Sequence, residues 1–402
     1  MAQRAWTDEF LNRMRLIGDE PADQLVQQLF AEHQVNAVNA MMRTLVENDK
    51  IPSGSSIPKN LREFLQSVAV LPPWADAKKV RLGEELFWQH GPAIVLILFC
   101  YSLPFCYAAR QEAHALALTG RLSKAPNRRV TETAQMLIDV MASGGLLGSG
   151  TGVRTAQKVR LMHAGVRFQI LASNEWNTEQ FNCPLNQEDL AGTLMSFSVI
   201  GLDGLRKLDI SVSEAEAEAY LHCWNVIGHI LGVLDDLLPV DLEDAVAFTN
   251  AFRNRQFAGC EEGRLMTKAL LDMMAHILPG NIFDFIPHAF ANFFLEQKTA
   301  QLLGIPAVPF DRELLLPLEL SNVIADDFVD SSGWMRKLVE LVSRHLLESL
   351  ELVARGGNRP SFRIPKRLWQ GWRRDTDPQM NLYLAIKKAV SFVVEWLQRR
   401  WG

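Results

Sequence analysis

The sequence predicts an all-α fold. Apolar residues recur at three- and four-residue spacing along most of the 402-residue chain, and the alternating runs typical of strands are nearly absent. A capping box supports one helix directly, because Ser213 is followed three residues later by Glu216. The predicted helices cover residues 8–16, 22–47, 59–70, 75–89, 128–142, 153–173, 187–202, 213–234, 241–256, 261–277, 333–354 and 380–400.

We expect these helices to fall into three parts of the chain, the last of which differs in composition. Residues 1–74 are a predicted N-terminal helical extension, and residues 75–354 are the main helical domain. Residues 355–402 carry 11 Lys and Arg against 3 Asp and Glu, with four tryptophans interleaved. Such a segment could touch a membrane surface or an anionic partner. We favour a solvated face packed on the same domain, because charge asymmetry alone says little about binding.

The overall composition excludes several classes of protein. With 41 Lys and Arg against 46 Asp and Glu, the chain lacks the basic field that nucleic-acid binding requires. Its five cysteines are odd in number and form no CxxC pair, which argues against a disulfide framework and a thiolate zinc site. Charges begin at Arg4 and no apolar signal-peptide run follows, so we expect a cytoplasmic protein.

Residues 91–109 form a charge-free stretch that just reaches the length of a membrane span. Pro92 and Pro104 interrupt it, and Tyr101, Ser102 and other polar groups lie inside it. A helix buried in a large core is the interpretation we favour over a membrane span. A third interpretation is a helix that lines an apolar ligand chamber.

The helix over residues 153–173 carries the sharpest candidate site. His163 lies among small apolar residues, with Arg160 one turn before it and Arg167 one turn after it on the same face. Two neighbouring cations disfavour imidazolium, so His163 should remain neutral and able to bind a metal. Haem binding needs one axial imidazole, an apolar wall and cations for two propionates. The alternative is a core histidine beside surface arginines.

The preceding helix carries a second stripe. Arg129, Thr133, Met136, Leu137 and Val140 lie on one face, which is apolar except at its N-terminal end. Buried Arg and Thr side chains need partners, which a ligand could supply. The alternative is a stripe that turns outward at its first turn.

The glycine run over residues 144–152 lacks the preceding strand and the Walker lysine of a nucleotide-binding loop. We therefore interpret it as the connection before a helix.

Two other patterns fit different chemistry. Residues 326–330, from Asp326 to Asp330, match the DDxxD pattern with which isoprenoid synthases bind Mg²⁺ and diphosphate, but the second motif is incomplete at Asp235–Asp236. His222 and His229 share a helix face without the Glu-x-x-His pairs of a dinuclear site. We interpret both histidines as core or pocket-lining residues.

Taken in order, three motifs suggest a family: TGRL at residues 119–122, Arg129 with Thr133, and VRLMHAGVR ending at Arg167. Over residues 75–240 the chain resembles the latex-clearing protein (rubber oxygenase) family, which includes fungal oxygenases that cut prenyl side chains. The resemblance implies a globin-like all-α core that holds one haem b, with extra helices at both ends. The helix over residues 91–109 would then line the distal side of the haem.

The resemblance also implies roles for individual residues. His163 would be the iron ligand, Arg160 and Arg167 would approach the propionates, and Arg129 and Thr133 would belong to a patch beside the haem. Rubber-cleaving members carry a lysine where this chain has Glu132, and their distal glutamate falls here between Glu112 and His114. We take Glu112 as the base.

The expected activity is therefore that of a haem-dependent oxygenase, which uses O₂ on an apolar, isoprenoid or other alkene substrate rather than on polymeric rubber. Two alternatives stay open. One is a non-catalytic haem or lipid-binding protein of the same fold. The other is a Mg²⁺-dependent isoprenoid synthase that uses residues 326–330. The oligomeric state is not fixed by any of these patterns.

Overall fold

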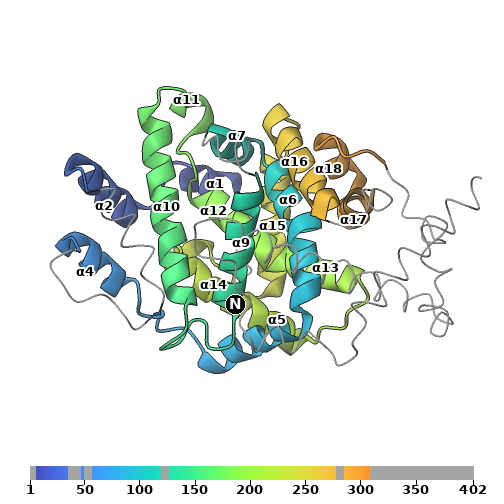
Figure 1. The fold of residues 1–402 in the computed structure, drawn as a ribbon, viewed down its shortest axis with the longest axis horizontal. Coiled ribbons are helices and arrows are strands. Elements are labelled where there is room, and N and C mark those ends of the chain that lie inside the picture. The colour runs from blue at the N-terminus through green and yellow to red at the C-terminus, as the bar shows by residue number, and fades with distance from the viewer. Residues whose placement is uncertain (1–5, 35–46, 49–56, 119–125, 278–284, 308–402) are drawn as a thin grey trace, which may run out of the picture.

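A computed structural model describes residues 6–34, 47–48, 57–118, 126–277 and 285–307, and its regular elements are helices (Figure 1). Within these ranges the only β pairing is an isolated antiparallel bridge between Ala109 and Phe257. The all-α prediction is confirmed. The predicted helices over residues 333–354 and 380–400, the basic segment 355–402 and the Asp326–Asp330 motif lie outside the described residues.

The helices follow one another in this order. They are α1 (Asp8–Met14), α2 (Glu20–Ala31), α4 (Lys59–Ser67), α5 (Ala77–Ile97), a π-helical turn (Leu98–Ser102), α6 (Leu103–Ala108), α7 (Arg110–Leu118), α9 (Pro126–Met141), α10 (Gly152–Ala172), α11 (Thr178–Phe181), α12 (Gln187–Phe197), α13 (Val199–Lys207), α14 (Glu214–Ile230), a 3₁₀ turn (Asp235–Leu237), α15 (Leu242–Gln256), α16 (Glu261–Ile277), α17 (Ile286–Phe294) and α18 (Gln297–Leu302).

A continuous helical rod, α5 with the π-helical turn and α6, forms the centre of the main hydrophobic core. Pro104 has no N–H to donate, and just before it the helix widens so that the Leu103 N–H bonds to the Leu98 carbonyl. Ala77–Ala108 is the one described helix long and apolar enough to cross a membrane, but 89% of its most apolar window is buried inside the structure. This burial agrees with the core-helix interpretation of residues 91–109.

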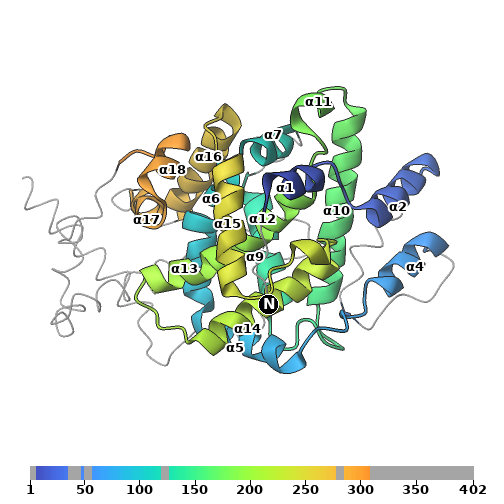
Figure 2. The same ribbon diagram turned by 180° about the vertical axis from the view of Figure 1, so that it is seen from behind.

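Helix α10 lies between the helix pair α2 and α4 and the main body of helices. Figures 1 and 2 show α2 and α4 on its outer side and the bulk of the helices on its inner side. A second, smaller hydrophobic cluster joins α2 and α4 to α10 through residues such as Leu25, Leu61 and Leu161. The N-terminal helices therefore cover the helix that carries His163.

Two predicted helices have different boundaries in the structure. The helix predicted over residues 22–47 ends at Ala31, because His33 takes a left-handed conformation (φ 57°). The His33 and Gln34 N–H groups then bond back to the Phe30 and Leu29 carbonyls, which closes the helix as a Schellman motif. Residues 35–46 lie outside the description.

The helix predicted over residues 187–202 is instead two helices. It breaks at Ser198, and the second helix continues to Lys207. Near this break the Ser102 hydroxyl donates to the Ser196 carbonyl at 2.6 Å.

The capping box at the start of α14 is confirmed, since Ser213 and Glu216 exchange both hydrogen bonds. Sequence patterns missed α7, α11, α17 and α18.

The glycine run forms a tight turn between α9 and α10. A Cβ atom on Gly152 would lie 2.7 Å from the Gly145 carbonyl oxygen and 2.9 Å from the Asp139 carbonyl oxygen, so only glycine permits this close approach. Glu84 of α5 accepts a hydrogen bond from the Gly144 N–H at 2.9 Å. The run thus connects two helices, as predicted. Thr151 occupies the N-cap position of α10, and its side chain makes no capping hydrogen bond.

Glu84 should make stability depend on pH. Burial raises the pKa of Glu84 from 4.5 to about 6, so the folded protein keeps a proton that the unfolded chain releases between these values. Glu84 therefore favours the folded state most when it is protonated, below pH 4.5. Its contribution to the free energy of unfolding is lost as the pH rises through 6. We expect Glu84→Gln to raise the free energy of unfolding at pH 7.5 by up to ~2 kcal/mol, with little gain at pH 4.5.

Urea unfolding at the two pH values measures this effect. Glu85→Gln is the matched control, because Glu85 is the next residue on α5 and is exposed. A Glu84→Gln protein that is less stable at pH 7.5, or that keeps the pH dependence of the wild type, contradicts the prediction.

Candidate functional site

Helix α10 brings the three predicted residues of its face together. Arg160 and Arg167 are buried, and His163 is half-buried between them. Ala156, Val166 and Ile170, which share this face, are also buried. The helix therefore presents one imidazole in an apolar setting with a guanidinium group one turn away on either side. This is the arrangement that the sequence predicted.

Each arginine already has a carboxylate partner from the N-terminal part of the chain. Arg160 donates to Asp19 through Nε at 2.6 Å and through Nη2 at 2.8 Å. Arg167 donates from Nε to Asp23 at 2.9 Å and from Nη1 to the Leu185 carbonyl at 2.7 Å. Sequence analysis missed both aspartates. The arginines are thus balanced by protein carboxylates, and the expectation that they approach haem propionates stays a prediction.

The second predicted stripe lies on α9, which packs along α10, α5 and α16. Met136, Leu137 and Val140 are buried as expected, and Thr133 is half-buried. Arg129 lies in the first turns of the same helix, and its side chain is outside the described residues. The apolar part of the stripe is therefore buried as expected, and the prediction for its Arg129 end stays untested.

Helix α7 separates the two candidates for the distal base. Glu112 is buried and accepts a hydrogen bond from the Thr193 hydroxyl of α12 at 2.9 Å. His114 instead contacts Glu262 of α16 at 2.9 Å and stacks on Trp176, with ring centroids 5.5 Å apart. Glu112 thus faces the interior of the helical bundle, whereas His114 is fixed among surface-side partners. The choice of Glu112 as the base stays a prediction.

Thr193 gives Glu112 a partner in either protonation state. Its Oγ1 lies 2.9 Å from Glu112 Oε1 and 2.8 Å from the Asp189 carbonyl oxygen. A hydroxyl has one proton to donate and can also accept. It can therefore donate to an ionised Glu112, or accept from a protonated Glu112 while donating to Asp189. Such a partner suits a carboxyl group that takes up and returns a proton.

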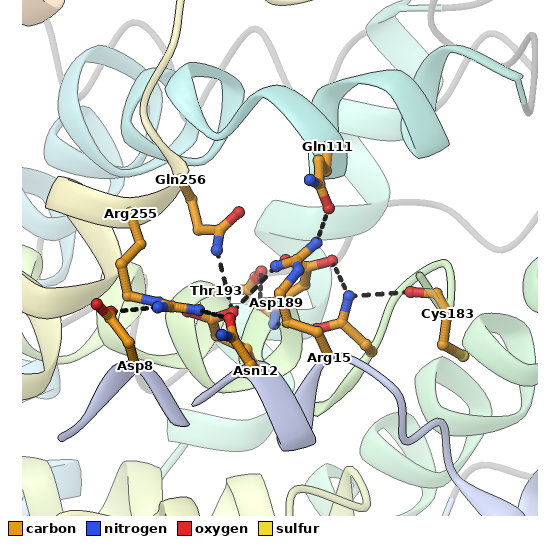
Figure 3. A network of polar contacts seen from close by, with 11 residues as sticks. Asp8, Asn12, Arg15, Gln111, Cys183, Asp189, Thr193, Arg255 and Gln256 are labelled. Carbon is orange, nitrogen blue, oxygen red and sulfur yellow. Dashed lines mark hydrogen bonds and ion pairs between the residues drawn. The ribbon is translucent and has the colours of Figure 1, made fainter. Parts of the chain in front are cut away.

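A buried polar network lies beside Glu112 and joins α1, α7, α12 and α15 (Figure 3). Arg15 donates to Glu188 at 3.1 Å and to Asp189 at 2.9 Å, and it also contacts Gln111, the residue before Glu112. Arg255 donates to the other oxygen of Glu188 at 2.8 Å. Both carboxylates are almost fully buried, so the two arginines are needed to balance their charge. The network anchors the N-terminal segment to the wall that holds Glu112.

His222 and His229 do not belong to this site. His222 accepts the Asp76 N–H at 2.9 Å, and His229 contacts Asp235 at 2.7 Å. Both imidazole rings pack nearly perpendicular to Trp74, with ring centroids 5.8 and 5.9 Å apart. They fasten residues 74–76 to α14 near the surface, which corrects their interpretation as core or pocket-lining residues. Among the described residues, no group of three or more His, Cys, Asp or Glu could hold a metal ion.

Comparisons with known proteins agree with the motifs. The sequence profile of the family described as "ER-bound oxygenase mpaB/B'/Rubber oxygenase, catalytic domain" matches residues 92–321. The chain belongs to this family. The match begins within α5 and includes Glu112, Arg129, Thr133, Arg160, His163 and Arg167, but it leaves out Asp19 and Asp23. The family resemblance drawn from the sequence is confirmed.

One relative and one solved structure show how far the likeness extends. A rubber oxygenase from a Streptomyces strain is 27% identical over 302 residues, which cover 74% of this chain and 73% of the relative. A structure of the latex-clearing protein in the closed state superposes with a TM-score of 0.68. It covers 94% of this chain and 90% of that protein at 24% identity, and it shows that the two share a fold.

The side chains around His163 supply some of the groups that haem binding requires. The axial ligand would be His163, the half-buried imidazole on α10, and the buried stripe of α9 offers the apolar wall that the macrocycle needs. Glu112 is a buried carboxyl on α7, and α7 packs against α10 where Ala115 meets Val166 and Ile170. The donor set and the apolar wall fit haem. Arg160 and Arg167 fit less well as propionate ligands, because their charges are balanced by Asp19 and Asp23.

Proposed function

We propose that this protein is a haem b-dependent oxygenase that acts on an apolar substrate with a C=C bond, such as an isoprenoid. The observation that carries the proposal is His163, held half-buried between two buried arginines on α10 inside the region that matches the oxygenase family. Membership of an oxygenase family supports the use of O₂. The name of the rubber oxygenase relative supports an isoprenoid type of substrate.

The proposed reaction adds both atoms of O₂ across a carbon–carbon double bond. The C=C bond breaks, two C=O groups form, and no external reductant is needed for the balance. Haem b, when bound, supplies the iron at which O₂ is activated. His163 would hold that iron, and the buried α9 stripe would exclude water from the reacting groups.

In this proposal Glu112 is the acid–base group. Its carboxylate would take a proton from the substrate carbon next to the double bond and return it to the substrate later in the reaction. The Thr193 hydroxyl, 2.9 Å from Glu112, would stabilise the carboxylate each time that Glu112 is ionised. Buried surroundings suit such a group, because bulk water would otherwise compete for the proton.

Turnover of a detergent-dispersed isoprenoid tests the proposal. The purified protein, loaded with haem, is incubated with squalene in detergent while O₂ consumption and carbonyl products are measured. We expect one O₂ consumed for each pair of carbonyl groups formed. Haem binding without O₂-dependent product from squalene or shorter alkenes would favour the non-catalytic binding protein instead. Location in the cytoplasm remains a prediction.

A further inference from the structure

The segment over residues 15–23 crosses α10 as a strap, a name used below for these residues. It joins α1 to the first turn of α2. The Gln187 backbone N–H donates to the Ile17 carbonyl at 2.9 Å, and its side chain donates to the Gly18 carbonyl at 2.8 Å. The Cys183 N–H donates to the Arg15 carbonyl at 3.1 Å. The strap is thus fixed to the body of the protein along its backbone.

Two carboxylates of the strap bind the two arginines that flank His163. Asp19 is almost fully buried and holds Arg160 through two of its nitrogens. Asp23 is partly exposed and holds Arg167, whose side chain is only 2% exposed. The Arg160 contact has the paired geometry in which Arg binds carboxylate most strongly, whereas Arg167 donates from Nε to both oxygens of Asp23, at 2.9 and 3.0 Å. The guanidinium groups therefore have strong partners without any ligand.

The backbone around these ion pairs leaves no spare room. A Cβ atom on Gly232, which has a positive φ of 87°, would lie 2.4 Å from Asp19 and 2.6 Å from Arg160. A Cβ atom on Gly18 would lie 2.7 Å from Asp23. Glycine at both positions lets the chain pass close to the charged groups. The surroundings are shaped to these ion pairs, which argues for a permanent contact rather than an occasional one.

We propose that the strap is a positioning element for His163: Asp19 and Asp23, and not the carboxylates of a bound haem, are the partners of Arg160 and Arg167. The two ion pairs attach α10 to the strap one turn before and one turn after the histidine. They therefore fix the rotation of α10 at the point where His163 leaves it. The inference rests on the proposed function only for the identity of the ligand that His163 holds.

The two roles for the arginines predict opposite effects when an aspartate loses its charge. If the strap positions His163, Asp19→Asn and Asp23→Asn loosen α10 and weaken binding of haemin to the apoprotein. We expect at least a tenfold rise in Kd and a weaker iron–histidine stretching band in the ferrous protein. If propionates are the natural partners, the freed guanidinium groups leave haemin affinity unchanged or increase it, and that result would overturn the proposal.

Matched variants separate these effects from a general loss of folding. Glu20→Gln removes a charge from the exposed residue between the two aspartates and should leave haemin affinity unaltered. Arg160→Gln removes the charge from the other side of the same pair. If the strap positions His163, the double variant Asp19→Asn with Arg160→Gln should bind haemin no more weakly than Asp19→Asn alone, because both changes break one contact. A further loss of affinity in the double variant would mean that Arg160 itself binds the ligand.

Hydrogen exchange keeps the test independent of haem. In apoprotein, we expect amides of residues 160–167 to exchange at least fivefold faster in Asp19→Asn than in Glu20→Gln. Equal exchange in the two variants would contradict the strap as a positioning element. If the wild type binds no haemin but Asp19→Asn still shows faster exchange, the proposed function fails and the strap still fixes α10.

Discussion

Replacement of His163 by alanine is expected to abolish haem retention. His163 is the half-buried imidazole of the α10 face, and an alanine there leaves no nitrogen to bind iron. The helix should survive the change, because alanine has the highest helix propensity. The purified variant should show no Soret band, and its haem content by pyridine haemochromogen assay should fall below a tenth of the wild-type content.

His276→Ala is the matched control, since His276 is an exposed histidine near the end of α16. It should retain full haem content. Addition of imidazole to apo His163→Ala with haemin should restore part of the Soret band by filling the lost ligand position. Full haem loading of His163→Ala without imidazole would remove His163 from its proposed role.

Replacement of Glu112 by glutamine should lower turnover while haem content stays normal. Glutamine has nearly the same shape and can still accept the Thr193 hydrogen bond, but it cannot take up a proton. A positioned acid–base group contributes about 10²–10⁴-fold to rate, so kcat should fall by a factor in this range. The measurement is O₂ consumption under saturating squalene, alongside the haem spectrum.

Two further variants separate the proton transfer from packing. Glu179→Gln changes an exposed glutamate on α11 and should leave kcat within twofold of the wild type. Thr193→Val keeps the carboxyl group but removes the hydrogen bond to its ionised form, so the acid limb of the pH–rate profile should move to higher pH. Normal turnover in Glu112→Gln at every pH would transfer the role of base to another residue.

The sequence predicted the α10 face because that face is a local pattern. Arg160, His163 and Arg167 are spaced by three and four residues, and the helix that carries them is long and uninterrupted. The partners of the arginines could not be found in the same way. Asp19 is 141 residues from Arg160, and in the sequence it reads as an ordinary acidic residue at a helix start. Only the folded chain brings the two together.

Element boundaries failed where a local exception ended a regular pattern. The helix predicted to residue 47 stops at Ala31 because a histidine, rather than the usual glycine, takes the left-handed position after it. Helix α7, with three alanines among its nine residues, has too weak an apolar stripe to be recognised. Because α7 was not predicted, the sequence did not show on which helix face Glu112 and His114 lie. Their different surroundings became apparent only from the packing.

The most direct test of the central claim is a UV–visible spectrum of the purified protein, recorded as isolated, after dithionite and after CO. The account predicts a strong Soret band that shifts on reduction and shifts again with CO. This would establish bound haem with a coordination position open to a diatomic gas. The absence of a Soret band, even when haem is supplied during expression and again in vitro, would contradict the account.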